Sequence, residues 1–172
     1  MSNIGKIKVH IPPSLTINRI NYDSDGFYTL IFIGPLGKIS INLPNYINIE
    51  ISHDGVISVN SENKVMWGTS RNMVLQAIIG VSTGFTKKLE LIGIGYKVGY
   101  ANNLLTFNLG KSHPIVIPVD NNIKINYINS TTITASSISN TSLSSFLHSI
   151  CQIKPAYKDH YKGKGIKITS NT

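Results

Sequence analysis

Residues 36–59 read LGKISINLPNYINIEISHDGVISV, and residues 109–135 read LGKSHPIVIPVDNNIKINYINSTTITA. Both stretches carry a Leu-Gly-Lys turn, a short strand that ends at a proline, a strand of alternating isoleucines and a further β-branched run. Corresponding positions are offset by about 73 to 76 residues throughout. The chain therefore contains an internal repeat of one supersecondary unit.

Each repeated stretch is preceded by further strands and followed by a helix. Runs of β-branched and aromatic residues predict strands at 15–20 and 28–33 in the first half, and at 89–94 and 105–109 in the second. Helical spacing follows in the first half at Met73, Val74, Ala77, Ile78 and Val81, and in the second at Leu143, Phe146, Leu147 and Ile150.

The ends of these helices carry capping signals. Gly84 stands where a C-terminal cap of the first helix is expected, and Asn140 is predicted to cap the start of the second. Strands followed by one helix, twice over, predict an α+β fold made of two tandem repeated domains, each an antiparallel sheet with one helix packed on one face. We expect the domains to span residues 1–82 and 83–172.

The positive charge is concentrated in the second half. The formal net charge is +8. Residues 1–82 hold six bases and five acids, a net charge of +1, whereas residues 83–172 hold ten lysines and three acids, a net charge of +7. The second half is therefore where a polyanion would bind.

The segment at 153–168, IKPAYKDHYKGKGIKI, is the most basic part of the chain. It carries five lysines against the single acid Asp159, with Tyr157, His160 and Tyr161 among them. Lysines that neutralise phosphates, rings that stack and glycines that allow close approach of the backbone are typical of nucleic-acid contact. The alternative is a solvated basic tail. We expect the stretch from about Tyr157 onward to be mobile until RNA neutralises it.

No motif in the sequence indicates catalysis. Gly110-Lys111-Ser112 lacks the first glycine and the following helix of a P-loop, and Gly93-x-Gly95 lacks the spacing of a dinucleotide fingerprint. The five histidines are scattered and the acids show no pairing for acid–base work. We therefore expect no enzymatic activity, no cofactor, no metal and no small-molecule substrate.

The glycine-rich stretch around Tyr96 and Lys97, and the single tryptophan Trp67, allow more than one interpretation. The glycines around Tyr96 are typical of a twisted or bulged hairpin, and a surface for close approach of another backbone is the alternative. We favour the hairpin for Gly93 and a phosphate contact for Lys97. Trp67 is interpreted as packing in the core or at the helix edge rather than as a stacking platform.

Composition bears on the cellular compartment. The lone Cys151 excludes an intramolecular disulfide, the N-terminus lacks an apolar signal sequence, and no apolar run is long enough for membrane insertion. Ile, Asn and Lys are abundant while Ala and Arg are scarce, as in proteins encoded by A/T-rich genomes, such as those of organelles or parasites.

Several segments in order resemble ribosomal large-subunit protein six of the bacterial and organellar type. They are Gly68–Arg71, Gly80–Phe85, the LELIGIGYK stretch at 89–97, Ser112-His113-Pro114 and Tyr161–Ile166. The resemblance implies two tandem α+β domains and a structural role in translation. It also implies binding to large-subunit rRNA mainly through the second domain, near the factor-binding region and the sarcin–ricin loop, beside neighbouring ribosomal proteins.

Together, the charge and the resemblance assign a set of rRNA-binding residues. They are Lys97, Lys111, Ser112, His113, Lys154, Lys158, His160, Tyr161, Lys162, Gly163, Lys164, Gly165 and Lys167. The A/T-rich composition favours a mitochondrial ribosome, with another organelle or the cytoplasm of an A/T-rich organism as the alternative. The second functional class is a free-standing nucleic-acid-binding regulator or interaction module, which would not sediment with large subunits.

Overall fold

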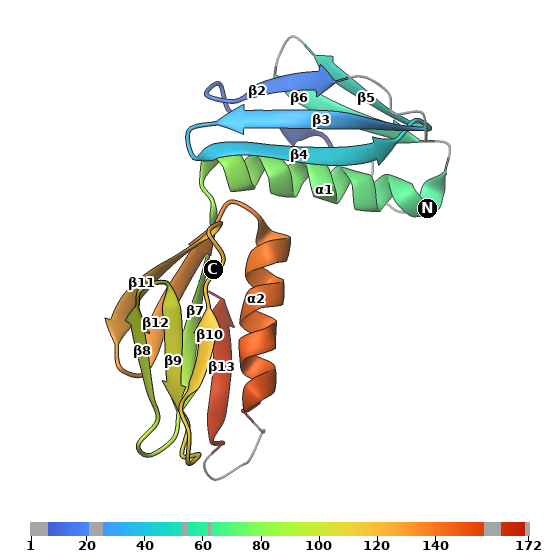
Figure 1. Ribbon diagram of the computed structural model, residues 1–172. Coiled ribbons are helices and arrows are strands. Elements are labelled where there is room, and N and C mark those ends of the chain that lie inside the picture. Colours follow the sequence, from blue (N-terminus) through green and yellow to red (C-terminus); the bar gives the residue numbers. More distant parts are fainter. Residues whose placement is uncertain (1–6, 21–25, 53–54, 62, 157–162, 171–172) are drawn as a thin grey trace. The chain divides into compact units, whose positions relative to one another are not determined.

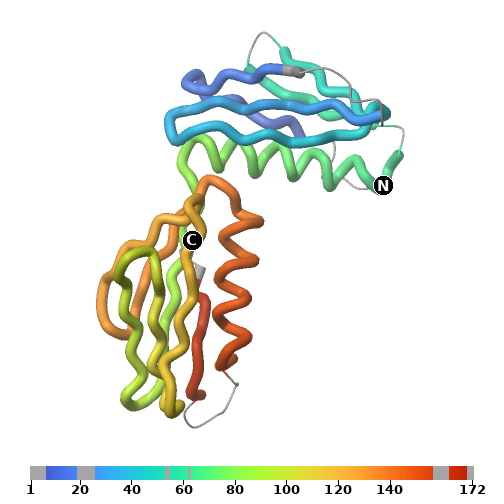
Figure 2. The backbone as a smooth tube through the Cα atoms, viewed as in Figure 1, coloured from blue at the N-terminus to red at the C-terminus, as the bar shows by residue number. Residues whose placement is uncertain are grey.

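The computed structural model describes residues 7–20, 26–52, 55–61, 63–156 and 163–170. The chain divides into two compact units, residues 1–84 and residues 85–172. Figures 1 and 2 show that both units combine sheets with one long helix.

The first unit contains two small antiparallel sheets and a helix. Its sheets have the strand orders β2-β3-β4 and β1-β6-β5. The helix α1 (Lys64–Ser82) packs on β4, β6 and β3. The described strands are β1 (Val9–His10), β2 (Thr16–Ile20), β3 (Phe27–Gly34), β4 (Gly37–Pro44), β5 (Ile47–Ser52) and β6 (Val56–Ser61).

The second unit repeats this plan and adds a strand. Its sheets have the orders β8-β9-β10 and β11-β12-β7-β13, and the helix α2 (Asn140–Ile153) packs on β13, β12 and β7. The described strands are β7 (Phe85–Ile92), β8 (Lys97–Ala101), β9 (Leu104–Asn108), β10 (Ile115–Pro118), β11 (Ile123–Asn129), β12 (Thr132–Ser137) and β13 (Gly165–Ser170).

Strand order confirms the repeat that the sequence predicts. The arrangement β1-β6-β5 in the first unit corresponds to β7-β12-β11 in the second, and β2-β3-β4 corresponds to β8-β9-β10. The predicted fold class is confirmed as α+β with a helix on antiparallel sheets in each repeat. What the second unit adds is β13, which pairs with the free edge of β7.

Alternating apolar residues build the core of the second unit. Leu89 and Ile133, on neighbouring strands, and Leu143 and Leu147, on α2, are fully buried in one cluster. Burying a side chain of this size contributes roughly 1.5–3 kcal/mol. The predicted helical stripe therefore faces the sheet, as its spacing requires.

The helix ends follow the predicted caps with one correction. Asn63 caps α1 by accepting the backbone N–H of Val65 at 3.1 Å. The cap of α2 is Ser139, which accepts the N–H of Ser142 at 3.3 Å, so the prediction of Asn140 was wrong by one residue. Both residue types cap helices well, and adjacent candidates cannot be separated by type alone.

The C-cap of α1 is Thr83, and the predicted Gly84 follows it as the first residue past the helix. The φ of Gly84 is +74°, and its N–H donates to the carbonyl of Ile79 at 3.0 Å, beside the N–H of Thr83 at 2.9 Å. A residue in the left-handed region just past a helix is a common C-terminal cap, and glycine takes that conformation without steric cost.

Replacing Gly84 with Ala should destabilise the first unit by about 1 to 2 kcal/mol, because a Cβ opposes the left-handed conformation. Replacing it with Asn should cost less, because Asn tolerates this region better. Thermal melts of the three proteins measure the difference. Equal melting temperatures for Gly84→Ala and the parent would contradict the assigned role.

Two predicted segments differ from the structure. The strand predicted at 89–94 ends at Ile92, and Ile94 lies in a turn with 87% of its surface exposed. The basic segment was expected to be irregular and mobile from about Tyr157 onward, yet Gly165–Ser170 forms β13 and Ile166 is buried in the core. We expected this segment to become ordered only on binding RNA. Instead, six residues of it are ordered by pairing with β7.

Candidate nucleic-acid interface

One end of the second unit brings together residues that the sequence analysis assigned to rRNA. Strands β7 and β9 end there, β8, β10 and β13 begin there, and α2 ends there (Figure 1). The side chains of Lys97, Lys111, Ser112, His113 and Lys164 are exposed at this end. Together with the half-buried Lys154 they define what we call the basic end.

The pairing of the strands and the turns between them explain why these residues lie together. Lys97 opens β8 opposite Asn108, the last residue of β9. The chain then turns through Gly110, whose φ is +71°, and the exposed Lys111, Ser112 and His113 before β10 begins. Gly165 pairs with Ile92 at the end of β7, which places Lys164 at the same edge. Segments about 70 residues apart in sequence therefore meet at one surface.

Lys154 has structural partners within the unit. Its Nζ donates to the carbonyl of Leu109 at 3.0 Å and lies 4.7 Å from the centroid of the Tyr96 ring. A cation over an aromatic face is attracted by the ring quadrupole. Lys154 therefore ties the end of α2 to the end of β9 and to the turn after β7. It positions the basic end in addition to adding charge.

The turn before Lys97 is built around Tyr96. Tyr96 is buried, and a Cβ on Gly93 would lie 2.6 Å from its ring. Only glycine leaves room for the ring at that position. This favours the structural interpretation of Gly93, while Lys97, two residues past the φ of +76° at Gly95, stays exposed.

Gly165 packs against the chain itself. The N–H of Ile166 donates to the carbonyl of Lys154 at 2.9 Å, and a parallel bridge joins Pro155 to Ile166. A Cβ on Gly165 would lie 2.5 Å from the backbone N and Cα of Ala156. The room that the sequence analysis assigned to RNA at Gly165 is therefore occupied by the protein's own backbone.

The remaining predicted residues fall partly outside the described residues. Lys158, His160, Tyr161 and Lys162 lie in the stretch 157–162, outside the described residues. Gly163 is described and half-exposed. Lys167 lies beyond the basic end, exposed in β13.

The described carboxylates of this unit lie away from the basic end. Glu90 sits within β7, where its Oε1 is 2.6 Å from Nζ of Lys88. The hydrogen bond and charge of Lys88, with a smaller contribution from Lys167, hold the pKa of Glu90 below its ordinary value. Asp120 follows β10, at the opposite end of the strands. The described cations of the basic end therefore have no described carboxylate to neutralise them.

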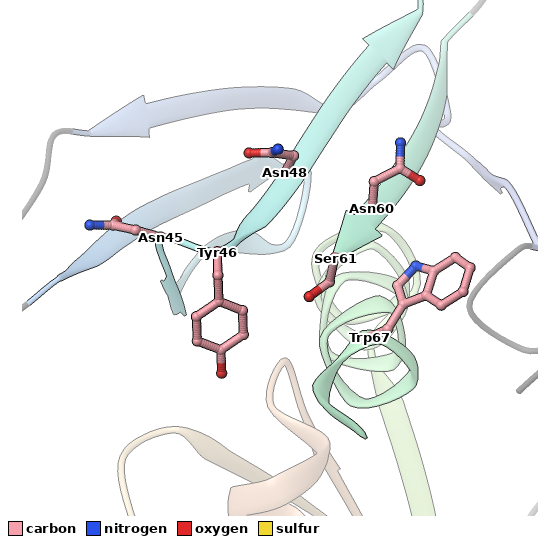
Figure 3. A pocket seen from close by; sticks show the side chains of 6 residues that line it. All are labelled: Asn45, Tyr46, Asn48, Asn60, Ser61 and Trp67. Atoms are coloured by element: carbon pink, nitrogen blue, oxygen red, sulfur yellow. The ribbon is translucent and has the colours of Figure 1, made fainter. Parts of the chain in front are cut away.

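A different kind of surface occurs in the first unit. A hollow of about 480 Å³ opens at the start of β5 (Figure 3), lined by Asn45, Tyr46, Asn48, Asn60, Ser61 and Trp67. Trp67 donates from its Nε1 to the carbonyl of Val59, which confirms the interpretation of helix-edge packing. These walls carry amides, hydroxyls and rings but no charged side chain.

Other kinds of site are not present in the described part of the chain. No group of three or more His, Cys, Asp or Glu among the described residues could hold a metal ion. Neither helix described here combines the length and apolar character needed to cross a membrane. Cys151 is a free thiol whose pKa is raised by burial.

Comparison with known proteins agrees with this architecture. No protein-family model matches the chain. It is 34% identical over 172 residues to "Large ribosomal subunit protein uL6" of Methylocella silvestris, covering 97% of this chain and 92% of that protein. It is 37% identical to "Large ribosomal subunit protein uL6c" of Porphyra purpurea, covering 97% and 91%, and 30% identical to uL6c of Arabidopsis thaliana, covering 98% and 74%. The chain therefore belongs to the uL6 family of large ribosomal subunit proteins, in its bacterial and organellar type.

Proposed function

We propose that the protein is a structural constituent of a mitochondrial large ribosomal subunit that binds large-subunit rRNA through the basic end of its second unit. We propose that this contact lies near the factor-binding region and the sarcin–ricin loop, among neighbouring ribosomal proteins. The protein has no enzymatic role in this proposal and uses no cofactor or small-molecule substrate.

One observation carries the proposal. Four separate segments contribute cations or hydrogen-bond donors to one end of the second unit, and Lys154 holds three of those segments in place. Lys97, Lys111 and Lys164 are exposed there without a described carboxylate partner. Uncompensated lysines on a rigid surface gain affinity for RNA by releasing counterions from phosphates.

The mitochondrial assignment is supported by composition. Ile, Asn and Lys exceed Ala and Arg, as A/T-rich codons would give, and only two of the sixteen bases are Arg. Relatives named as large ribosomal subunit proteins come from bacteria, algae and a plant. Of these settings, the composition favours an organelle with an A/T-rich genome.

Sedimentation of a tagged full-length chain tests the proposal. The protein should migrate with large ribosomal subunits prepared from purified mitochondria and move to light fractions after ribonuclease treatment. A known large-subunit protein serves as the reference in the same gradient. Light fractions without ribonuclease would instead support a free-standing nucleic-acid-binding regulator. Recovery with cytoplasmic or other organellar ribosomes would correct the compartment alone.

A further inference from the structure

The four-stranded sheet of the second unit has one apolar and one polar face. Directly paired residues of antiparallel strands lie on the same face, and successive residues alternate. Leu89 pairs with Ile133 on one side and with Ile168 on the other. The core residues of this sheet all share that face: Leu89, Leu91, Ile123, Ile133, Ala135 and Ile166. We call the opposite side, which is turned away from α2, the polar sheet face.

Three lysines are spread evenly over the polar sheet face. Lys124, Lys88 and Lys167 stand on β11, β7 and β13, and the register places them in three successive rows across the sheet. Glu90 is the one described acid in these rows, and it pairs with Lys88. A net positive charge therefore covers this face from edge to edge.

Hydroxyl groups fill the space between the lysines. Thr132, Thr134 and Ser136 alternate along β12, while Thr86 and Thr169 lie in the same rows on β7 and β13. All five are exposed or half-exposed. The paired residues of these three rows include no aromatic ring and no aliphatic side chain. The exposed aliphatic side chains nearby are Ile92, in the next row, and Ile128, at the bulge of β11.

This chemistry fits the backbone of an RNA double helix. Proteins recognise A-form helices through contacts to 2′-hydroxyls and phosphates across a shallow groove, which suits a flat surface of lysines and hydroxyls. Recognition of unpaired bases instead relies on stacking platforms, and these rows offer none. The surface therefore favours duplex RNA over single strands.

The repeat shows that the fold does not require the full set of these lysines. The corresponding sheet of the first unit has the same strand order, β1-β6-β5. There Asn48 occupies the position of Lys124, Glu50 that of Asn126 and Ser58 that of Thr134. Lys8 stands at the position of Lys88, because the pair Val9 and Ile57 corresponds to Leu89 and Ile133. One topology thus presents a net positive face in the second unit, whereas Lys8 and Glu50 balance each other among the described charges of the corresponding face in the first.

The polar sheet face adjoins the basic end. The row after Lys167 and Glu90 is the pair Gly165 and Ile92, where β13 begins, and Lys164 precedes it. Three residues of extended strand separate Lys164 from Lys167, about 10 Å. A ligand held at the basic end can therefore continue onto this face.

We propose that the polar sheet face is a second RNA-binding surface, which docks on the backbone of an RNA double helix next to the contact made by the basic end. This rests on the proposed function, since it assumes that the chain binds rRNA. The two surfaces should protect different nucleotides.

Directed cleavage locates the partner. Fe(II)-EDTA is tethered to a cysteine introduced as Thr134→Cys, at the centre of the face, in full-length protein that also carries Cys151→Ser. The matched control is Ser58→Cys, its counterpart in the first unit. With refolded large-subunit rRNA of the source organism, cleavage should cluster in paired nucleotides for Thr134→Cys and be weaker or elsewhere for Ser58→Cys. Equal cleavage by both, or cuts confined to single strands, would overturn the inference.

Removing the lysines tests their contribution. The triple variant Lys88→Gln, Lys124→Gln, Lys167→Gln should lower the slope of log affinity against log salt by roughly 1 to 2, since each phosphate contact contributes about 0.9 by analogy with duplex DNA. The control variant Lys8→Gln, Lys38→Gln, Lys64→Gln removes the same charge from exposed sites in the first unit. Circular dichroism checks that both variants fold.

The outcomes separate the two proposals. Loss of slope together with retained footprint at the basic end supports the second surface. An unchanged slope in a folded variant overturns it and leaves the proposed function standing. Parent protein that does not bind the rRNA overturns both. If cysteine at position 134 crosslinks in assembled subunits to a neighbouring protein and not to RNA, the face is a protein contact and the inference is wrong.

Discussion

Replacing Lys97, Lys111 and Lys164 with Gln should reduce the slope of log affinity against log salt for large-subunit rRNA by about 2 to 3. These side chains are exposed at the basic end, so each can release counterions on binding while contributing little to the fold. The effect should exceed that of the polar sheet face, where Glu90 partly offsets Lys88. Affinities measured over a salt series give the slope directly.

The control for this variant is the first-unit triple substitution at Lys8, Lys38 and Lys64. Lys38 is the repeat counterpart of Lys111, since each follows a Leu-Gly pair at a strand turn. We expect the control to bind rRNA with nearly the parent slope. Equal losses in both variants would mean that net charge alone determines affinity, and that the basic end is not a defined site.

Replacing Gly165 with Val should destabilise the second unit by about 2 to 3 kcal/mol or more. A Cβ there would lie 2.5 Å from the backbone of Ala156 and 2.6 Å from the carbonyl oxygen of Pro155, and backbone atoms cannot rotate away. Each 1 kcal/mol corresponds to roughly 4–8 °C in the melting temperature of a unit of this size. Differential scanning calorimetry can resolve the unit affected.

Gly99→Val provides the matched control for Gly165→Val. Gly99 also lies in a strand of the second unit, and a Cβ on it meets nothing within 4 Å. Val is favoured in strands, so stability should be unchanged or slightly higher. Similar melting of both valine variants would show that the contact between Ala156 and Gly165 is dispensable.

The repeated units were predictable because local patterns define them. Alternation at Ile47, Ile49 and Ile51, and again at Ile123 and Ile125, is a signal that short windows capture. The helical stripe of α2 is equally local. The match between the two halves predicted that both share one topology, but the strand order itself comes from the structure.

The strand β13 was missed because its signal is masked by charge. Ile166 and Ile168 alternate with Lys167 and Thr169, which is a strand pattern, yet the five lysines of 153–168 suggested a tail. The partner strand β7 lies more than 70 residues earlier in the chain, so local sequence does not reveal the pairing. Its outward Lys167 was predicted to bind rRNA, and the pairing places it on the polar sheet face.

The role of Lys154 could not be derived from sequence either. Its position next to Pro155 marks the end of a helix, but the direction of its side chain depends on where Leu109 and Tyr96 lie. The same local sequence allows a long, flexible lysine side chain to extend into solvent or to donate to a backbone carbonyl. The tertiary structure alone selects the carbonyl.

The pairing of β13 with β7 also sets a delay during synthesis of the protein. Gly165 is translated 73 residues after its partner Ile92. At 5–20 residues per second, the outer edge of β7 waits about 4 to 15 s for its neighbour. During that interval the edge exposes unpaired backbone groups that could pair with another chain. The first unit ends at Gly84 and needs no strand that is synthesised later. The rate of translation through residues 93–165 should therefore influence how much of the second unit reaches its native state.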